Sequence, residues 1–474
     1  MWRTDCLSHY VRCPALVLSL TLLTGHSVTA QSAGTGPTPS GSSPEGGPAA
    51  RHLEKTGEPL PSAPSAQKDL ASGAPSAGSG PQLRLTLADA VGMAERNNPR
   101  IQEASAVAQR AAAGAVTARQ YTNPSAEIYE GDQYSRPVAN PGTPGLLQHY
   151  AVLQTIEIPS ERRARARVAQ FGVTGSRSAS QVVALSVVAD AKHAFYNALR
   201  QQEEIHHAQE NLQLVQDLRR RVEVEVQTGE KGRLELTRAE AELARAQFAV
   251  RSAEIQYVNA IANLRVTIAA QADAKLEPVG EFEPRTNLPP IDDLRRTVLS
   301  AHPLLAASQA DTSAAQAEMD RQRALRIPQP VAFAEYENQP DLRFWRTGVS
   351  IPIPLWDRRR GQIADAKATI SQSQAVMRER QLELIAQLER AYEQYQLADQ
   401  QVTSLESGSL RAAESAVEAA KAAYRFGERG IVEVLDAQRV LQNVRGDLLD
   451  AQFARQSALV DLESLGAVSP AGRP

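Results

Sequence analysis

Two carboxylates, Glu433 and Asp436, lie three residues apart in a segment of helical pattern that follows a glycine-bounded break. Residues three apart share one face of a helix, so the two side chains form a small acidic patch. A solvated, charged helix face is the plainest interpretation, and an acid–base dyad is another. If several copies of the chain faced a common axis, these patches would form a narrow ring of carboxylates, which favours cations in a pore.

Other side chains that could carry chemistry do not converge in the sequence. We find no nucleophile–base pair, phosphate-binding glycine loop or cluster of metal ligands that stands out. His206 and His207 are adjacent and point in different directions on a helix, whereas a tetrahedral metal site needs convergent ligands. We therefore expect no enzyme activity, no cofactor and no metal site. The net charge of −3, without a basic stripe, gives no support for a nucleic-acid partner.

The acidic pair belongs to one of two long stretches without proline, residues 160–277 and 355–469. Because proline disrupts helix interiors, each stretch predicts very long helices that fold back once. The folding points are expected at two similar breaks, Gly-Glu-Lys-Gly at 229–232 and Gly-Glu-Arg-Gly at 427–430. Glycine ends helices by adopting the left-handed conformation. The predicted turn residues are Gly229, Gly232, Gly427 and Gly430.

The chain repeats itself between residues 83 and 466. Asn98-Pro99 recurs as His302-Pro303, and the two glycine breaks recur at a similar offset. Each unit is predicted to contain a helix, two short strands, a long helix, a break and a shorter helix. The first unit, 83–285, has expected strands near 126–132 and 149–158, and the second, 286–466, near 331–337 and 343–353. A tail, 467–474, follows.

The predicted helices match one another in length. The opening helices are expected at 87–120 and 291–326, the long helices at 160–226 and 356–426, and the returning helices at 233–270 and 431–465. At about 1.5 Å per residue, each long helix spans about 100 Å, and an opening and a returning helix together equal it. Narrow apolar stripes, as at Leu382, Ile385 and Leu388, favour lateral coiled-coil packing. These features predict the wall of a tube with water on both faces.

The N-terminal region predicts export. Arg3 and Arg12 precede the apolar run 15–23, and Val-Thr-Ala at 28–30 offers a cleavage site, which together are typical of a signal peptide over 1–30. An N-terminal anchor helix is the alternative. The only cysteines, Cys6 and Cys13, do not follow the apolar run, so no lipid anchor is expected. Residues 31–82 are rich in Pro, Gly and Ser and are predicted to be a disordered tether.

The predicted strands are suited to a membrane. Strands of about ten residues with two different faces are what a membrane barrel needs, although small soluble hairpins are the alternative. Four strands cannot close a barrel, and lipid does not tolerate open sheet edges. Three copies would give about twelve strands, within the range of outer-membrane barrels. We therefore expect a homotrimer in contact with outer-membrane lipid, while counting alone leaves two or four copies open.

Several motifs resemble the TolC-like outer-membrane factor family. The segment 424–438, Tyr-Arg-Phe-Gly-Glu-Arg-Gly-Ile-Val-Glu-Val-Leu-Asp-Ala-Gln, is similar to the most recognisable stretch of the family, and 85–90 with Asn-Asn-Pro at 97–99 resembles its opening helix. The motifs at 156–163 and 353–360 are most similar to its CzcC-type heavy-metal efflux branch. The resemblance covers about residues 83–466.

The resemblance implies a fold and a function. The fold is mainly α with a small membrane β-barrel: as a trimer, the repeated units would form a twelve-stranded β-barrel on a periplasmic α-helical barrel. The function is a passive exit duct in the bacterial outer membrane, conducting substrates, heavy-metal cations in this branch. A periplasmic adaptor and an inner-membrane RND-type pump would be its partners. The alternatives are a multidrug efflux or type I secretion duct of the same fold, or a periplasmic coiled-coil adaptor.

The resemblance also assigns roles to individual residues. Both glycine breaks fall at the periplasmic tip, where the adaptor would bind. Glu235, Tyr424 and Arg429 match the network that closes the tip, and Glu433 and Asp436 match an acidic constriction ring. The family most often has Asp at the positions of Glu235 and Glu433. Because Arg can form a forked contact with a carboxylate, Arg429 is expected to pair with a residue such as Glu235.

Overall fold

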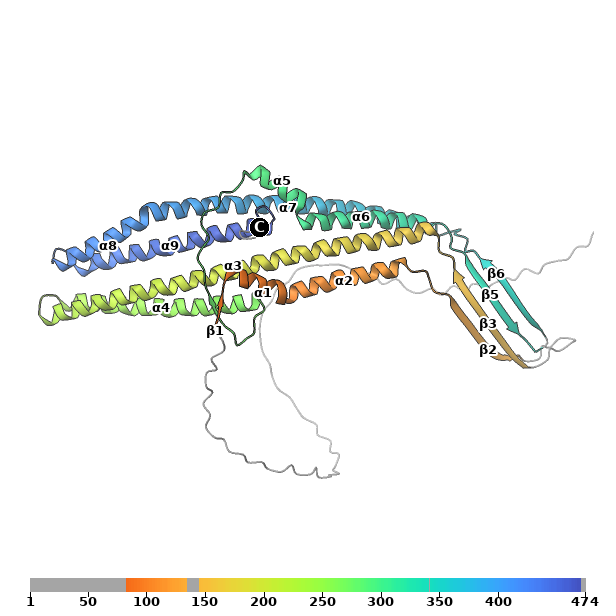
Figure 1. Ribbon diagram of the computed structural model, residues 1–474, viewed down its shortest axis with the longest axis horizontal. Coiled ribbons are helices and arrows are strands. Elements are labelled where there is room, and N and C mark those ends of the chain that lie inside the picture. Colours follow the sequence, from red (N-terminus) through yellow and green to blue (C-terminus); the bar gives the residue numbers. More distant parts are fainter. Residues whose placement is uncertain (1–81, 134–144, 341, 470–474) are drawn as a thin grey trace, which may run out of the picture. The chain divides into compact units, whose positions relative to one another are not determined.

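The computed structural model describes residues 82–133, 145–340 and 342–469; the predicted signal peptide, almost all of the predicted tether and the end of the tail lie outside these residues. The first half contains β1 (Gln82–Leu85), α1 (Leu87–Asn97), α2 (Pro99–Arg119), β2 (Ser125–Gln133), β3 (Gly145–Thr155), α3 (Pro159–Gln227), α4 (Arg233–Thr267) and β4 (Lys275–Pro278). The second half contains α5 (Ile291–Ala301), α6 (Pro303–Ala324), β5 (Val331–Asn338), β6 (Arg343–Ser350), α7 (Arg360–Ser404), a π-helical turn η1 (Leu405–Ser409), α8 (Leu410–Arg425) and α9 (Ile431–Ser464). The two halves repeat the same order of helices around a strand pair (Figure 1).

The opening helix of each unit is broken, which corrects the expectation of one continuous helix. The first unit breaks at Asn98 and the second at His302, each with extended backbone angles. The reason is the proline that follows, because it disfavours helical angles in the residue before it. Both residues then cap the next helix: Asn98 Oδ1 accepts from Arg100 N at 2.9 Å, and His302 Nδ1 accepts from Leu304 N at 3.1 Å.

The long helix of the second unit is also interrupted, whereas that of the first unit is not. Helix α3 runs through 69 residues, or about 100 Å, without a break. Its counterpart, predicted to span 356–426, begins only at Arg360 and contains the π-helical turn η1. The turn includes Ser407-Gly408-Ser409, and such small residues are poor helix formers. The sequence pattern therefore predicted the course of this helix but not its defect.

The four longer strands form one antiparallel sheet in the order β2-β3-β5-β6. The observed strands differ from the expected ones by a few residues: β3 begins at Gly145, four residues earlier, and β6 ends at Ser350, just before the alternating prolines of Ile-Pro-Ile-Pro. Proline cannot donate a ladder hydrogen bond, which accounts for the end of β6. Within the described residues, β2 and β6 each have one edge without a partner strand.

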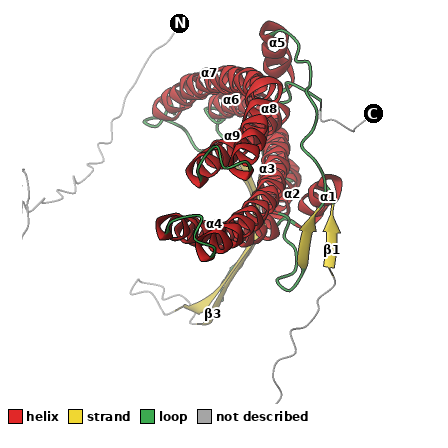
Figure 2. Ribbon diagram, turned by 90° about the vertical axis from the view of Figure 1, so that its left-hand side faces the viewer, coloured by secondary structure: helices red, strands yellow, loops and turns green. Residues whose placement is uncertain are grey.

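The order of the helices follows the order of the strands. Helix α3 packs on α2 and α6, and α6 packs on α7, so the helices that adjoin β2, β3, β5 and β6 lie in the same sequence as those strands. The chain reverses direction between α3 and α4 and again between α8 and α9. In the half of the helical layer that ends at these reversals, α4 packs on α3, α3 on α9, and α9 on α8 and α7. Figure 2 shows these helices as one layer, with α1 and α5 on the same side of it. The edge strands β2 and β6 therefore lie on the same two sides of the chain as the helices α2 and α7 that adjoin them.

Two rows on opposite faces of the sheet differ chemically. Directly opposite residues share a face, and Ile128, Tyr150, Tyr336 and Trp345 form one such row across all four strands. All four side chains are exposed, from 42% for Tyr336 to 74% for Trp345. A row on the other face consists of Glu127, Ala151, Glu335 and Arg346, with an ion pair between the last two. The first row is thus apolar and the second largely charged, while each face also carries residues of the other kind, such as Glu130 beside Ile128 and Phe333 beside Glu335.

The main apolar cores lie where the half-length helices meet the long ones. Phe195, Tyr196 and Leu264 belong to the core of the first unit, and Leu388 and Leu462 to that of the second. The sequence did not indicate the parallel pair β1–β4, which covers the first core. The connector between the units, 279–290, is held by Tyr395, whose hydroxyl donates to Thr286 O and accepts from Thr286 N, both at 2.8 Å.

We predict that Tyr395→Phe loosens this connector. The substitution removes two hydrogen bonds, each worth about 1 kcal/mol, without opening a cavity. Trypsin cleaves after Arg285, directly before Thr286, so the rate of cleavage there should rise in limited proteolysis. Tyr392→Phe is the matched control, because the Tyr392 hydroxyl has no hydrogen bond in the described structure. Equal cleavage rates in the two variants would show that Tyr395 does not hold the connector.

Candidate functional site

The two chain reversals are built alike, as the glycines predicted. Gly229 and Gly427 have left-handed angles, with φ of 82° and 72°. After each, two successive backbone N–H groups donate to one carbonyl of the preceding helix, that of Glu225 in the first reversal and that of Ala423 in the second. Gly232 and Gly430 are extended and precede the first residues of α4 and α9. We call residues 228–232 and 426–430 the tip turns.

Tyr424 links the two tip turns. It is 7% exposed and packs among apolar side chains such as Val222, Ile431 and Val434. Its hydroxyl donates to Glu225 Oε2 at 2.5 Å, and the Lys231 ammonium lies 5.8 Å from its ring. Burial first, then the nearby Glu225 and Glu235 carboxylates, raises the pKa of Tyr424, so its hydroxyl stays protonated and remains a donor. Glu225 was not predicted from the sequence, where it is one of many glutamates on a charged helix.

The expected contact between Arg429 and Glu235 is not made within the chain. Glu235 Oε2 is buried and has no hydrogen-bond partner in the described structure. Arg429 lies exposed in the second tip turn, and no ion pair joins it to the described residues. The carboxylate that meets Tyr424 is Glu225, one turn before the reversal, rather than Glu235 after it. Of the three predicted gate residues, the single chain therefore brings only Tyr424 and Glu235 into the same neighbourhood.

Glu433 and Asp436 lie on one exposed face of α9, while Val434 and Leu435 between them are buried. The acidic face is partly neutralised. Arg439 Nη1 lies 3.1 Å from Asp436 Oδ1, and its Nη2 lies 2.8 Å from Glu242 Oε2 on α4. The i,i+3 spacing of Asp436 and Arg439 is visible in the sequence, but Glu242 is almost two hundred residues away.

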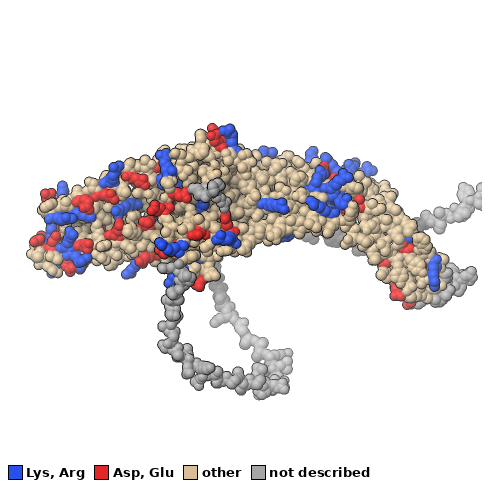
Figure 3. Space-filling model, viewed as in Figure 1, with Lys and Arg blue, Asp and Glu red and all other residues tan. Residues whose placement is uncertain are grey.

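A row of polar contacts joins α3 to α9 between the tip turns and the end of α9. These contacts pair Asn211 with Gln438, Glu210 with Arg445, Arg200 with Asp450, His193 with both Ser457 and Asp461, and Lys192 with Glu463. Figure 3 shows acidic and basic side chains intermingled over this half of the helical layer. Apolar clusters lie at both ends of the row, around Val222 and around Phe195. The seam between the two hairpins is thus held mainly by side-chain hydrogen bonds and ion pairs.

One set of side chains in this seam has the residue types of a hydrolase triad. His193 Nδ1 lies 3.0 Å from Ser457 Oγ, and its Nε2 lies 2.9 Å from Asp461 Oδ1. A triad also needs backbone donors aimed at a developing oxyanion. Ser457 lies inside α9, where the backbone N–H groups bond within the helix. The set therefore cross-links two helices and does not form a catalytic site.

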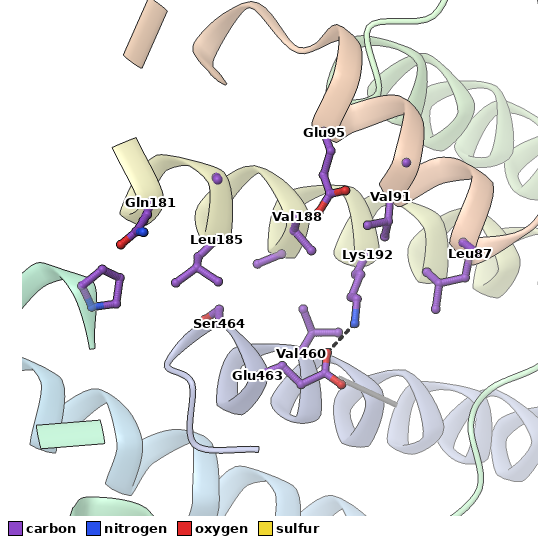
Figure 4. Close-up of a pocket in the computed structure, with 15 residues that line it drawn as sticks. Leu87, Val91, Glu95, Gln181, Leu185, Val188, Lys192, Val460, Glu463 and Ser464 are labelled. Carbon is purple, nitrogen blue, oxygen red and sulfur yellow. Dashed lines mark hydrogen bonds and ion pairs between the residues drawn. The ribbon is translucent and has the colours of Figure 1, made fainter. Parts of the chain in front are cut away.

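A cavity of about 670 Å³ lies where α1, α3 and α9 meet (Figure 4). Its wall is largely apolar, with Leu87, Val91, Leu185 and Val460 among the lining residues. Lys192 Nζ meets Glu463 Oε2 at 2.5 Å in this wall, and only about a tenth of either side chain is exposed. Within the described ranges, no group of three or more His, Cys, Asp or Glu residues is arranged to hold a metal ion. None of the described helices combines the length and apolarity needed to span a membrane.

Known proteins share both sequence and fold with this chain. Residues 294–467 match a family described as outer membrane efflux protein. The chain is 28% identical over 217 residues to the cobalt-zinc-cadmium resistance protein CzcC of Cupriavidus metallidurans, a match that covers 45% of this chain and only 50% of CzcC. Among solved structures, CusC has a TM-score of 0.69 at 18% identity, covering 80% of this chain and 91% of CusC. The Campylobacter jejuni CmeC outer membrane channel has a TM-score of 0.71 at 16% identity, covering 80% and 85%.

These similarities confirm the main expectations from the sequence. The chain resembles TolC-like outer-membrane factors, including a CzcC-type relative, and has their mainly α fold. Because the matched family consists of efflux proteins, the expectation that the chain is not an enzyme is also confirmed.

We predict that Lys192→Met destabilises the seam. The substitution keeps the length of the side chain but leaves the buried Glu463 carboxylate without its lysine, which typically costs about 3–5 kcal/mol. The thermal midpoint followed by circular dichroism should fall clearly, and adding Glu463→Leu should restore most of it. Lys367→Met, at an exposed position of α7, is the control. A midpoint equal to that of the control would contradict a stabilising role for the pair.

Proposed function

We propose, from the membership of residues 294–467 in the outer membrane efflux protein family and from the channel fold of the whole described chain, that three copies form an exit duct. Four strands from each copy would close a β-barrel of about twelve strands in the outer membrane. The helices would continue it as a tube through the periplasm. The duct would conduct its substrates passively, driven by a pump to which an adaptor connects it.

The pair of opposed rows in the sheet, one apolar and one largely charged, is the observation that carries this proposal. Its exposed row Ile128, Tyr150, Tyr336 and Trp345 suits lipid, and the opposed row with Glu127, Glu335 and Arg346 suits a water-filled lumen. Its edges, β2 and β6, lie on the same flanks as the edges of the helical layer. A neighbouring copy that pairs with one flank would therefore complete the sheet and the helical wall together. The predicted signal peptide, 1–30, would direct the chain to this location without a lipid anchor.

Heavy-metal cations are the substrates that we propose. The support is the similarity to a cobalt-zinc-cadmium resistance protein and the exposed carboxylates Glu433 and Asp436 near the tip turns. In a trimer these would form a ring of six carboxylates, whose negative charge Arg439 would partly neutralise. The tip turns would bind a periplasmic adaptor, and through it an RND-type inner-membrane pump. A duct for drugs or for secreted proteins is the second candidate, favoured by the fold shared with other outer membrane channels such as CmeC.

Deletion of the gene in its native bacterium tests the substrate class. We expect sensitivity to cobalt, zinc and cadmium to rise and sensitivity to a panel of hydrophobic drugs to stay unchanged, because the duct would serve a cation pump. Complementation with the intact gene is the control, and the outer-membrane fraction should contain a heat-modifiable, detergent-resistant trimer. Increased drug sensitivity alone would reject metal export while leaving the duct in place. A monomer outside that fraction would reject the duct.

We predict that Arg429→Ser raises single-channel conductance in planar bilayers. In the trimer, the exposed Arg429 guanidinium would reach a carboxylate of the adjacent copy, such as the half-buried Glu235, and hold the tip closed. One such exposed pair contributes only about 0–1 kcal/mol, but three act together. Tyr424→Phe, which frees Glu225, should raise conductance in the same direction.

Arg425→Ser is the matched control for this experiment. Arg425 is exposed near the end of α8 and makes no hydrogen bond or ion pair with the described residues. Arg425→Ser removes the same positive charge from the tip as Arg429→Ser but leaves the proposed closing contact intact. If Arg429→Ser and Arg425→Ser have the same conductance as the unmodified channel, Arg429 is not a latch.

A further inference from the structure

We infer that a collar of arginines, where the strands join the helices, binds the anionic headgroups of phospholipids in the membrane leaflet next to the helices. The collar comprises residues 119–122, 155–167, 318–330 and 351–361, which adjoin the ends of β2, β3, β5 and β6. The inference rests on the proposed function, because it requires the strands to lie in a membrane. It adds a lipid-binding site to the duct.

The collar has a large excess of positive charge. Its four segments contain eleven arginines, five acidic residues and no lysine. Figure 3 shows a cluster of Lys and Arg side chains over the part of the helices nearest to the strands, with few acidic ones among them. The chain as a whole has a net charge of −3, so this excess is local. In a trimer it would form a continuous positive ring.

Most of the acidic residues in the collar already form ion pairs with arginines of the collar. The Glu157 and Glu161 side chains are only 3% exposed and lie at 3.0 and 3.4 Å from the Arg165 guanidinium. Glu161 also contacts Arg321, which in turn contacts Glu318. These pairs fix the ends of the helices to one another. They leave little negative charge to neutralise the remaining arginines.

Four arginine side chains in the collar are exposed and free. No hydrogen bond or ion pair joins the guanidinium groups of Arg163, Arg326, Arg358 and Arg360 to the residues that the structure describes. Arg163 lies in the first turn and a half of α3, Arg326 just after α6, Arg358 just before α7, and Arg360 at its first position. Four free guanidinium groups, at the strand-side ends of three helices, therefore face solvent.

Exposed apolar side chains accompany these arginines. Trp356 is 92% exposed, Ile353 74% and Leu355 60%, all in the segment before α7. Tyr121, at the end of α2, is 65% exposed, and the Arg162 guanidinium lies 4.1 Å from the centre of its ring. Large apolar side chains mixed with Trp, Tyr and Arg are typical of the interface between hydrocarbon and headgroups. The surface is thus suited to a partner that is apolar on one side and anionic on the other.

A phospholipid leaflet is the partner that fits both properties. The guanidinium group binds phosphate oxygens with two parallel hydrogen bonds, and it gives up its hydration more easily than an ammonium group, which agrees with an all-arginine collar. Trp345 lies five residues before the end of β6 that adjoins the collar, or about 17 Å at 3.3 Å per residue, so a lipid tail beside it would place its headgroup near the collar. An acidic protein surface would satisfy the arginines but would not explain the exposed Trp356, Ile353 and Leu355.

Fluorescence quenching by brominated lipids tests the inference. The chain has three tryptophans, and Trp2 belongs to the predicted signal peptide, so Trp345→Phe leaves Trp356 as the reporter beside the collar. The full mature protein is reconstituted in phosphatidylcholine vesicles that contain an equal fraction of brominated phosphatidylglycerol or brominated phosphatidylcholine. We expect the anionic lipid to quench Trp356 more strongly, and high salt to reduce the difference.

Replacing the four free arginines by glutamine should abolish this preference. Each arginine in contact with a headgroup contributes about fivefold to the relative binding of anionic lipid. The matched control replaces Arg238, Arg245, Arg251 and Arg378, which are exposed on α4 and α7 away from the collar and remove the same charge. The control should keep the preference.

The outcomes separate the collar from the duct. If the protein inserts and conducts but quenching by the two lipids is equal, the collar does not bind anionic lipid and the duct stands. If the collar variant keeps the preference, the free arginines are not its source and the inference is wrong. If the unmodified protein neither inserts nor conducts, the proposed function is wrong and the collar with it.

Discussion

The unpaired backbone groups on the edges of the four-stranded sheet constrain the rest of the structure. A sheet edge exposes a row of N–H and C=O groups that must find partners, and lipid offers none. The edge strands β2 and β6 adjoin α2 and α7, which also lie at the edges of the helical layer. Any copy that pairs with β6 must therefore bring its helices beside α7. The two halves of one chain already meet in this manner, because β3 pairs with β5 and the adjoining helices α3 and α6 pack together.

The helical half of the chain joins its two hairpins mainly through polar side chains. Apolar clusters fix the tip and the level of Phe195, and between them Arg200, Arg445 and their partners form the seam. An exposed ion pair contributes little and re-forms easily in water. A seam of this kind keeps two hairpins in register while allowing small displacements between them. The buried pair Lys192–Glu463 is the exception, and it lies at the end of α9, where displacement is least compatible with the adjoining core.

Sequence reasoning recovered long-range order better than local defects or contacts. The absence of proline and the two glycine breaks predicted the long helices and tip turns, because both effects are local to the backbone. The breaks at Asn98 and His302 were missed although each precedes a proline, since the apolar pattern continues across them. Glu225 and Glu242 could not be identified, because their partners Tyr424 and Arg439 are almost two hundred residues away and the surrounding helices are rich in glutamate. Similarly, the sequence gives no sign that β1 pairs with β4, two segments of only four residues each.

The distribution of charge separates the regions that hold the chain together from those that face other molecules. Along the α3–α9 seam nearly every arginine has a carboxylate partner, so charge there serves the fold. In the collar the carboxylates are buried against Arg165 and Arg321, while other arginines stay free beside exposed aromatic rings. At the tip, Arg429 is free and the half-buried Glu235 lacks a hydrogen-bond partner on Oε2 within the described chain. An uncompensated charge is costly unless water or a partner satisfies it. The free arginines of the collar and the pair Arg429 and Glu235 at the tip are therefore the charges for which we propose partners outside the chain, a lipid at the collar and an adjacent copy at the tip.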